Sequence, residues 1–115
     1  MYGLTTGVGA GKLTRVDAAD AAANSSRIVR SHLVGVGPAF PTDVVRAAVL
    51  VLVNGFCGGW SGVRPETAGR YVEALNERRV PEIHALGSVG QADLAPLAEL
   101  AAHVLADVED RKSVV

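Results

Sequence analysis

The segment TDVVRAAVLVLVNG, residues 42–55, decides the fold class that the sequence indicates. Its apolar residues recur at helical spacing, but Val and Leu fill the remaining sides as well. A helix that is apolar all round is a buried helix. A strand in the core is the alternative, since Val is β-branched. The run is longer than a typical strand and ends in glycines, so we expect a buried helix with Thr42 as its N-cap.

Further helices are expected on both sides of this segment, at residues 17–32, 64–77 and 94–108. Asp17 and Asp93 precede two of them as candidate N-caps. Pro65 falls in the first turn of another, where its missing N–H does no harm. Residues 80–90 are expected to form a loop, and no stretch alternates convincingly enough to predict a strand. The sequence therefore predicts an all-α fold of about four helices joined by Gly/Pro loops.

The composition is that of a globular chain with a core of small side chains. Nearly half of the 115 residues are apolar, 49%, but only 4% are aromatic. Small side chains bury little area each, so packed helices need length or partners to be stable. The net charge of −1 and the lack of a basic patch exclude a nucleic-acid binder. The single cysteine and the absence of a signal peptide or spanning segment predict a cytoplasmic protein that has no membrane partner.

Several isolated sequence patterns are more simply explained without a binding or catalytic role. GVGAGK at residues 7–12 lacks the first glycine of a phosphate loop and the Ser or Thr after its lysine, so a flexible turn is expected. The three histidines have no ligand spacing, and no metal site is predicted. Cys57 has no histidine near it in sequence and reads as a buried apolar group.

The segment GSVGQAD at residues 87–93 is more informative. A glycine-rich turn leads directly into a helix whose first N–H groups are unpaired. Such a helix end can hold an anion or an electrophile. An ordinary loop with an N-cap is the alternative, and it is the more common arrangement.

Five stretches in order resemble one family, the aromatic amino acid ammonia-lyases and aminomutases that use a 4-methylideneimidazole-5-one (MIO) group. They are YGLTTGVG at residues 2–9, RSHLVGVG at 30–37, NGFCGGWSGVRP at 54–65, GSVG at 87–90 and DLAPLA at 93–98. The similarity reaches to about Leu105 and is greatest to the histidine ammonia-lyase type. It implies an N-terminal fragment of a helical enzyme that assembles as a homotetramer.

The resemblance also implies roles for individual residues. Tyr2 falls where the family has its catalytic base, and a phenol with its ordinary pKa near 10 would have to be deprotonated to act. Ser31 and His32 fall where the family reads the substrate ring, and the histidine-specific members look like this. The implied activity is removal of ammonia from an L-amino acid of the histidine type, which gives an α,β-unsaturated acid.

One departure from the family concerns its electrophile. Between Gly90 and Asp93 the family has Ala-Ser-Gly, which cyclises to MIO, whereas this chain has only Gln91 and Ala92. Cyclisation needs the serine for water loss and the glycine nitrogen as nucleophile. No prosthetic group is therefore expected in this chain, and a repurposed or non-catalytic family member, such as a binding subunit, is the alternative function.

A second departure concerns length. The resemblance covers about the first quarter of a family member. We expect residues 1–109 to form the N-terminal segment of a lyase-like domain, and residues 110–115 to be a tail that does not match.

Overall fold

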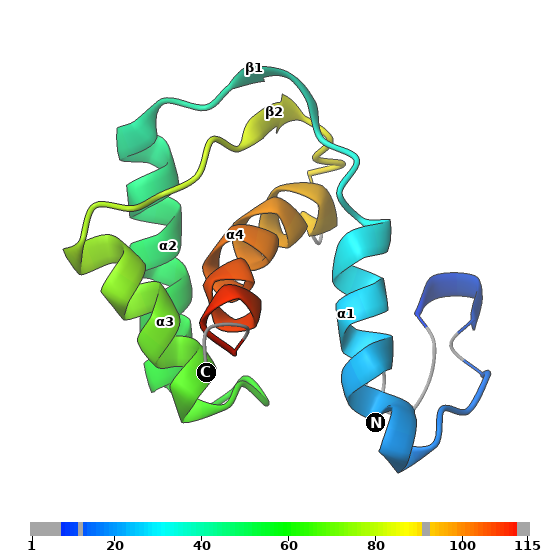
Figure 1. The fold of residues 1–115 in the computed structure, drawn as a ribbon. Coiled ribbons are helices and arrows are strands. Elements are labelled where there is room, and N and C mark those ends of the chain that lie inside the picture. The colour runs from blue at the N-terminus through cyan, green and yellow to red at the C-terminus, as the bar shows by residue number, and fades with distance from the viewer. Residues whose placement is uncertain (1–7, 12, 91–92, 113–115) are drawn as a thin grey trace.

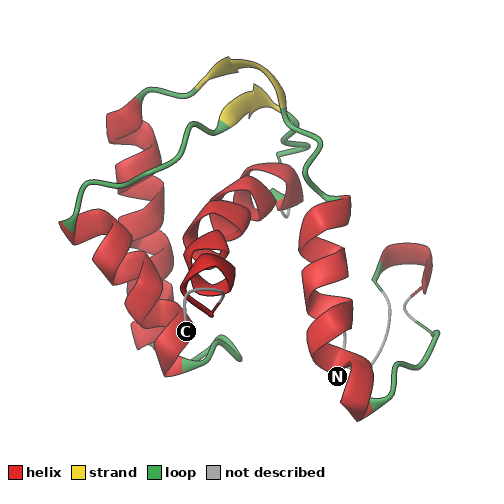
Figure 2. Ribbon diagram, viewed as in Figure 1, coloured by secondary structure: helices red, strands yellow, loops and turns green. Residues whose placement is uncertain are grey.

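The computed structural model describes residues 8–11, 13–90 and 93–112, and these residues are predominantly helical. The elements in chain order are η1 (Gly9–Gly11), η2 (Ala18–Asp20), α1 (Ala21–Ser31), β1 (Val36–Ala39), α2 (Thr42–Cys57), α3 (Pro65–Asn76), β2 (His84–Leu86) and α4 (Leu94–Lys112). Figures 1 and 2 show α4 between the α2–α3 pair and α1, with the two strands crossing one end of the molecule. The expected four-helix, Gly/Pro-linked fold is confirmed. None of the described helices combines the length and apolar character that crossing a bilayer requires.

The expectation of no strand was wrong. β1 and β2 form a two-stranded antiparallel ribbon in which Val36 pairs with Leu86 and Ala39 with His84, with an irregularity between these pairs. All four residues of β1 are exposed, so the segment lacks the apolar alternation by which a half-buried strand is recognised. The pairing is set by the partner strand, which lies far away in sequence.

Two of the expected helix caps are also not formed. α1 begins at Ala21, after η2, and the Asp17 side chain makes no capping hydrogen bond. α2 begins at Thr42 itself, with Pro41 in extended conformation as its N-cap residue. The expected start of α3 is confirmed, because Pro65 occupies its first turn after Arg64.

The core is small and lies where α2, α3 and α4 meet. Its buried members are Val45, Val49, Tyr71, Ala74, Ile83, Leu100 and Val104. Helix α1 packs against α4 and not against α2 or α3 to any comparable extent. α4 therefore joins α1 to the rest of the fold.

Helix α2 is only half buried, in contrast to the sequence expectation. Val49 is completely buried, but Leu50 and Val51 are 61% and 72% exposed. The reason is that α3 packs on one side of α2, where Val45 and Val49 share the core with residues of α4, and no other described element packs to a comparable extent on its opposite side. Cys57, expected to be buried, is exposed as well.

Val49→Ala should lower the free energy of unfolding by about 2 kcal/mol, because it removes two buried methyl groups and leaves a cavity. The matched change in the same helix, Val51→Ala, should cost less than about 0.5 kcal/mol. Thermal and urea unfolding followed by circular dichroism measure both. Equal losses for the two variants would contradict the assignment of the core to this side of α2.

Candidate functional site

Ser31 and His32 lie at the C-terminal end of α1. The Ser31 hydroxyl donates a hydrogen bond to the Ile28 carbonyl at 2.9 Å, and His32 Nδ1 lies 2.7 Å from the same oxygen. Ser31 Oγ and His32 Nδ1 are 3.2 Å apart. A carbonyl oxygen only accepts, so Nδ1 must carry the proton in this arrangement.

This hydrogen bond determines the protonation of the other ring nitrogen of His32 when the ring is neutral. In the neutral ring Nε2 carries the lone pair, and no described residue forms a recorded hydrogen bond with it. The half-buried ring is therefore oriented by its own helix, and its Nε2 makes no hydrogen bond within the described part of the chain. This geometry fits recognition of a polar ring, which is the role the resemblance implies.

Gly35, three residues after His32, lies in close contact with Gly87, in the segment that leads to Gly90. A Cβ on Gly87 would lie 3.2 Å from the Gly35 Cα and 3.1 Å from the Ala95 Cβ. Since a chain advances at most about 3.6 Å per residue, His32 and Gly90 each lie within roughly 11 Å of this crossing. The crossing therefore ties the segment that follows Ser31 and His32 to the segment that leads to Gly90.

A carboxylate from α4 fixes this crossing. Glu99 Oε2 accepts the backbone N–H of His84 at 2.8 Å, and Oε1 lies 2.9 Å from His84 Nδ1. A Cβ on Gly35 would meet this carboxylate, with the Glu99 Cδ at only 2.9 Å. Gly35, His84 and Glu99 thus form one packed unit. Sequence reasoning treated His84 as an isolated histidine and missed Glu99, because a loop separates the two residues and no spacing rule connects them.

A side chain joins the described ends of the 88–93 segment. Ser88 Oγ donates a hydrogen bond to Asp93 Oδ1 and accepts the Gly90 N–H at 3.0 Å. Gly90 has a positive φ of 75°, which favours glycine. Of the sequence-predicted site residues, Gly90 and Asp93 are thus linked through Ser88. Tyr2, Gln91 and Ala92 lie outside the described residues.

The residues present do not fit the MIO group. No serine stands between Gly90 and Asp93, and Ser88, the nearest one, has its hydroxyl engaged with Asp93. Neither the required serine nor the required glycine nitrogen is therefore in place. Burial raises the pKa of the Tyr71 hydroxyl above its usual value. Tyr71 packs edge-on against Phe56, with ring centroids 5.6 Å apart, as a core residue.

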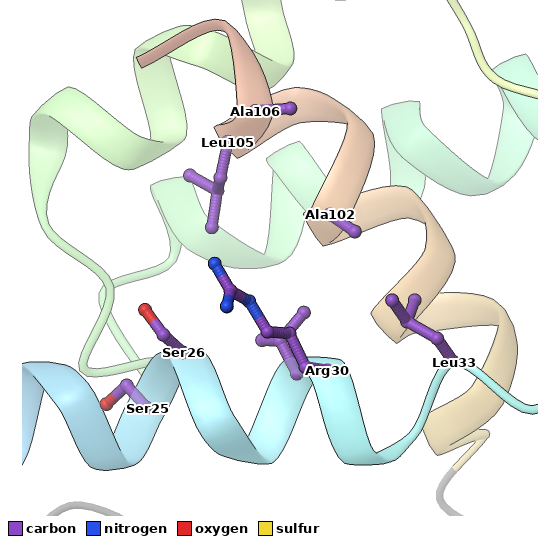
Figure 3. Close-up of a pocket in the computed structure, with 8 residues that line it drawn as sticks. Ser25, Ser26, Arg30, Leu33, Ala102, Leu105 and Ala106 are labelled. Carbon is purple, nitrogen blue, oxygen red and sulfur yellow. The ribbon is translucent and has the colours of Figure 1, made fainter. Parts of the chain in front are cut away.

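Two cavities lie beside the site segments, and neither is lined by Ser31 or His32. One, of about 320 Å³, separates α1 from α4, and Figure 3 shows Arg30 reaching across it toward Leu105. The other, of about 350 Å³, lies between α2 and α4 and has Ser88 and Asp93 among its lining residues. Among the described residues no group of three His, Cys, Asp or Glu side chains could hold a metal ion.

Comparison with known proteins gives one consistent family. A family model described as aromatic amino acid lyase matches residues 1–112. Histidine ammonia-lyase from Clostridium tetani is 41% identical over 101 residues, which is 87% of this chain and 20% of the relative. The MIO-dependent tyrosine 2,3-aminomutase from Streptomyces globisporus is 39% identical over 108 residues, 93% of this chain and 20% of that protein.

Solved structures agree with the sequence matches. A crystal structure of a tyrosine aminomutase mutant superposes with a TM-score of 0.85 at 35% identity and covers 97% of this chain. The tyrosine aminomutase from Streptomyces globisporus superposes with a TM-score of 0.81 at 35% identity, over 93% of this chain and 23% of that structure. The chain thus spans about a fifth of the length of its curated relatives.

Gly35→Ala should disturb the site by pushing Glu99 away from His84. Overpacking of this kind typically costs about 1–3 kcal/mol, and the His84 amide should exchange its hydrogen faster once its acceptor moves. Hydrogen exchange and thermal unfolding measure the two effects.

Gly69→Ala serves as the matched control, because a Cβ there meets nothing within 4 Å. This change lies in α3 and should stabilise the helix by up to about 1 kcal/mol. Unchanged exchange at His84 in the Gly35 variant would show that Gly35 does not support this contact.

Proposed function

Because the chain belongs to the aromatic amino acid lyase family, we propose that it forms part of a histidine-type ammonia-lyase homologue. The proposed reaction removes ammonia from an L-amino acid and leaves an α,β-unsaturated acid. The observation that carries this proposal is the orientation of His32. Its Nδ1 donates to the Ile28 carbonyl, so Nε2 of the neutral ring is able to accept a hydrogen bond from a ligand.

His32 suits a substrate with a polar ring. An imidazole substrate offers both an N–H donor and a ring nitrogen acceptor, and Nε2 of a neutral His32 accepts the donor. A phenyl ring offers neither group. The similarity to histidine ammonia-lyases supports the same substrate class. We propose Ser31 as the residue that helps to fix the His32 ring, since its hydroxyl approaches Nδ1.

The elimination itself needs more than ring recognition. The β C–H bond breaks, its electron pair forms the double bond, and the amine leaves with the C–N pair. We propose Tyr2 as the base that takes the β-proton. In the family, an electrophile holds the departing amine, and the loop at Gly90, Gln91, Ala92 and Asp93 lacks the residues that form it.

The altered loop favours a second candidate function, binding of the amino acid without elimination. An amine is a poor leaving group unless it is activated, and Ser88 is already engaged with Asp93. A binding subunit would keep His32 and dispense with the electrophile. In either function the intact protein is proposed to assemble as a homo-oligomer.

Two measurements on the intact protein separate these candidates. Isothermal titration calorimetry reports binding of L-histidine, and an enzymatic ammonia assay reports elimination. Binding with ammonia release supports the lyase, and binding without release supports the binding subunit. No binding at all rejects the proposed substrate class.

His32→Gln and His32→Asn should affect histidine binding differently. The Gln amide reaches about as far as Nε2, whereas the shorter Asn reaches only to the position of Nδ1. We expect Asn to weaken binding roughly five- to ten-fold relative to Gln, because one net hydrogen bond contributes about 1 kcal/mol. Calorimetry with L-phenylalanine is the control and should show no such difference. Equal binding of L-histidine by the two variants would argue against contact through Nε2.

Tyr2→Phe should abolish ammonia release and leave the dissociation constant for histidine nearly unchanged. The phenylalanine ring retains the shape of the side chain but cannot take a proton. Ammonia release and calorimetric binding are compared in the same preparation. Turnover that survives the change would exclude Tyr2 as the base.

A further inference from the structure

Helix α2 exposes a long surface without charge. From Ala47 to the end of the helix its exposed residues are Ala47, Ala48, Leu50, Val51, Asn54 and Cys57. A helix that faces solvent normally carries charged residues on that side. The sequence of α2 is that of a fully buried helix, yet the described residues bury only one side of it.

A groove continues this surface toward α4. Val44, Ala48 and Val51 follow one another at helical spacing, and the first two line the cavity of about 350 Å³. The opposite wall is Leu97 of α4, and Leu94 extends it by three residues. We call these five residues, Val44, Ala48, Val51, Leu94 and Leu97, the apolar face. Its four large side chains are between 44% and 72% exposed.

The comparisons indicate what covers the apolar face. The matched segment is only 20% of each of two relatives, so about four-fifths of the family fold lies outside these 115 residues. The same helices superpose with a TM-score of 0.85 on a chain of which they form 24%. The helices are therefore arranged here as they are within a much longer protein. The groove between α2 and α4 stays open, because α2 has not moved onto α4.

We propose that the apolar face is the docking surface for the helical remainder of the lyase fold, the part that follows the matched segment in the relatives. The lack of charge on α2 beyond Arg46 fits an apolar helical partner and not a charged one. The proposal rests on the fold and the uncovered surface, so it holds whether or not the protein binds histidine.

The test uses the corresponding remainder of the Streptomyces globisporus tyrosine aminomutase, co-expressed with the 115-residue chain. The aminomutase's own matched segment is the positive control for capture of that remainder. We expect a one-to-one complex by size-exclusion chromatography with light scattering. Val51→Asp should abolish the complex, whereas Val72→Asp, a matched change at an exposed position of α3, should leave it intact. Failure of the chain to bind a remainder that the control segment captures would overturn the proposal.

Cysteine labelling gives a second measurement that does not depend on a disruptive variant. In a Cys57→Ser background, Val51→Cys should react with a maleimide in the chain alone. It should react at least about ten-fold more slowly in the complex, as expected for a face covered most of the time. Leu13→Cys, at an 88% exposed position, is the control and should react equally in both. Protection of Val51→Cys in the chain alone would indicate a second copy on this face and overturn the proposal, as would unprotected labelling in the complex.

Discussion

The close approach of Gly35 to Gly87 is the contact on which the arrangement of the site depends. Two segments about fifty residues apart in sequence meet there without side chains between them. The ribbon of β1 and β2 continues from this point, and Glu99 ties it to α4 through the His84 amide and ring. Because a Cβ at Gly35 would occupy the place of the Glu99 carboxylate, the same glycine serves both contacts. The end of α1 and the start of α4 are thereby held together, and α4 is the described helix against which α1 packs most.

In the proposed function, the chain keeps a residue for ring recognition and lacks the residues that form the electrophile, and the two regions are held by different hydrogen bonds. His32 takes its orientation from the Ile28 carbonyl within its own helix, and nothing in that interaction requires the loop after Gly90. Ser88 in turn donates a hydrogen bond to Asp93. The hydrogen bonds that orient His32 and those that join Ser88 to Gly90 and Asp93 thus share no residue.

The Ala- and Val-rich composition and the uncovered side of α2 have a common physical origin. Small side chains give each helix little area to bury, so stability requires that several faces of each helix be covered. Val49 is covered from within the chain and Val51, two residues later, is not. A helix with this composition is suited to the inside of a larger assembly of helices, which is what the relatives' greater length provides.

The sequence by itself determined the helical class, the positions of the four helices to within a few residues and the family, because helical periodicity and ordered motifs are local properties of the chain. It also indicated the lost serine and glycine between Gly90 and Asp93. Only the tertiary structure decided the β1–β2 pairing, the crossing of Gly35 and Gly87 and the His84–Glu99 contact. Each of these joins residues that no sequence spacing connects, and β1 carries no apolar alternation to reveal it. The caps expected from Asp17 and Thr42 were wrong for a related reason: the chain enters these helices through η2 and Pro41, so the residues that precede α1 and α2 are Asp20 and Pro41.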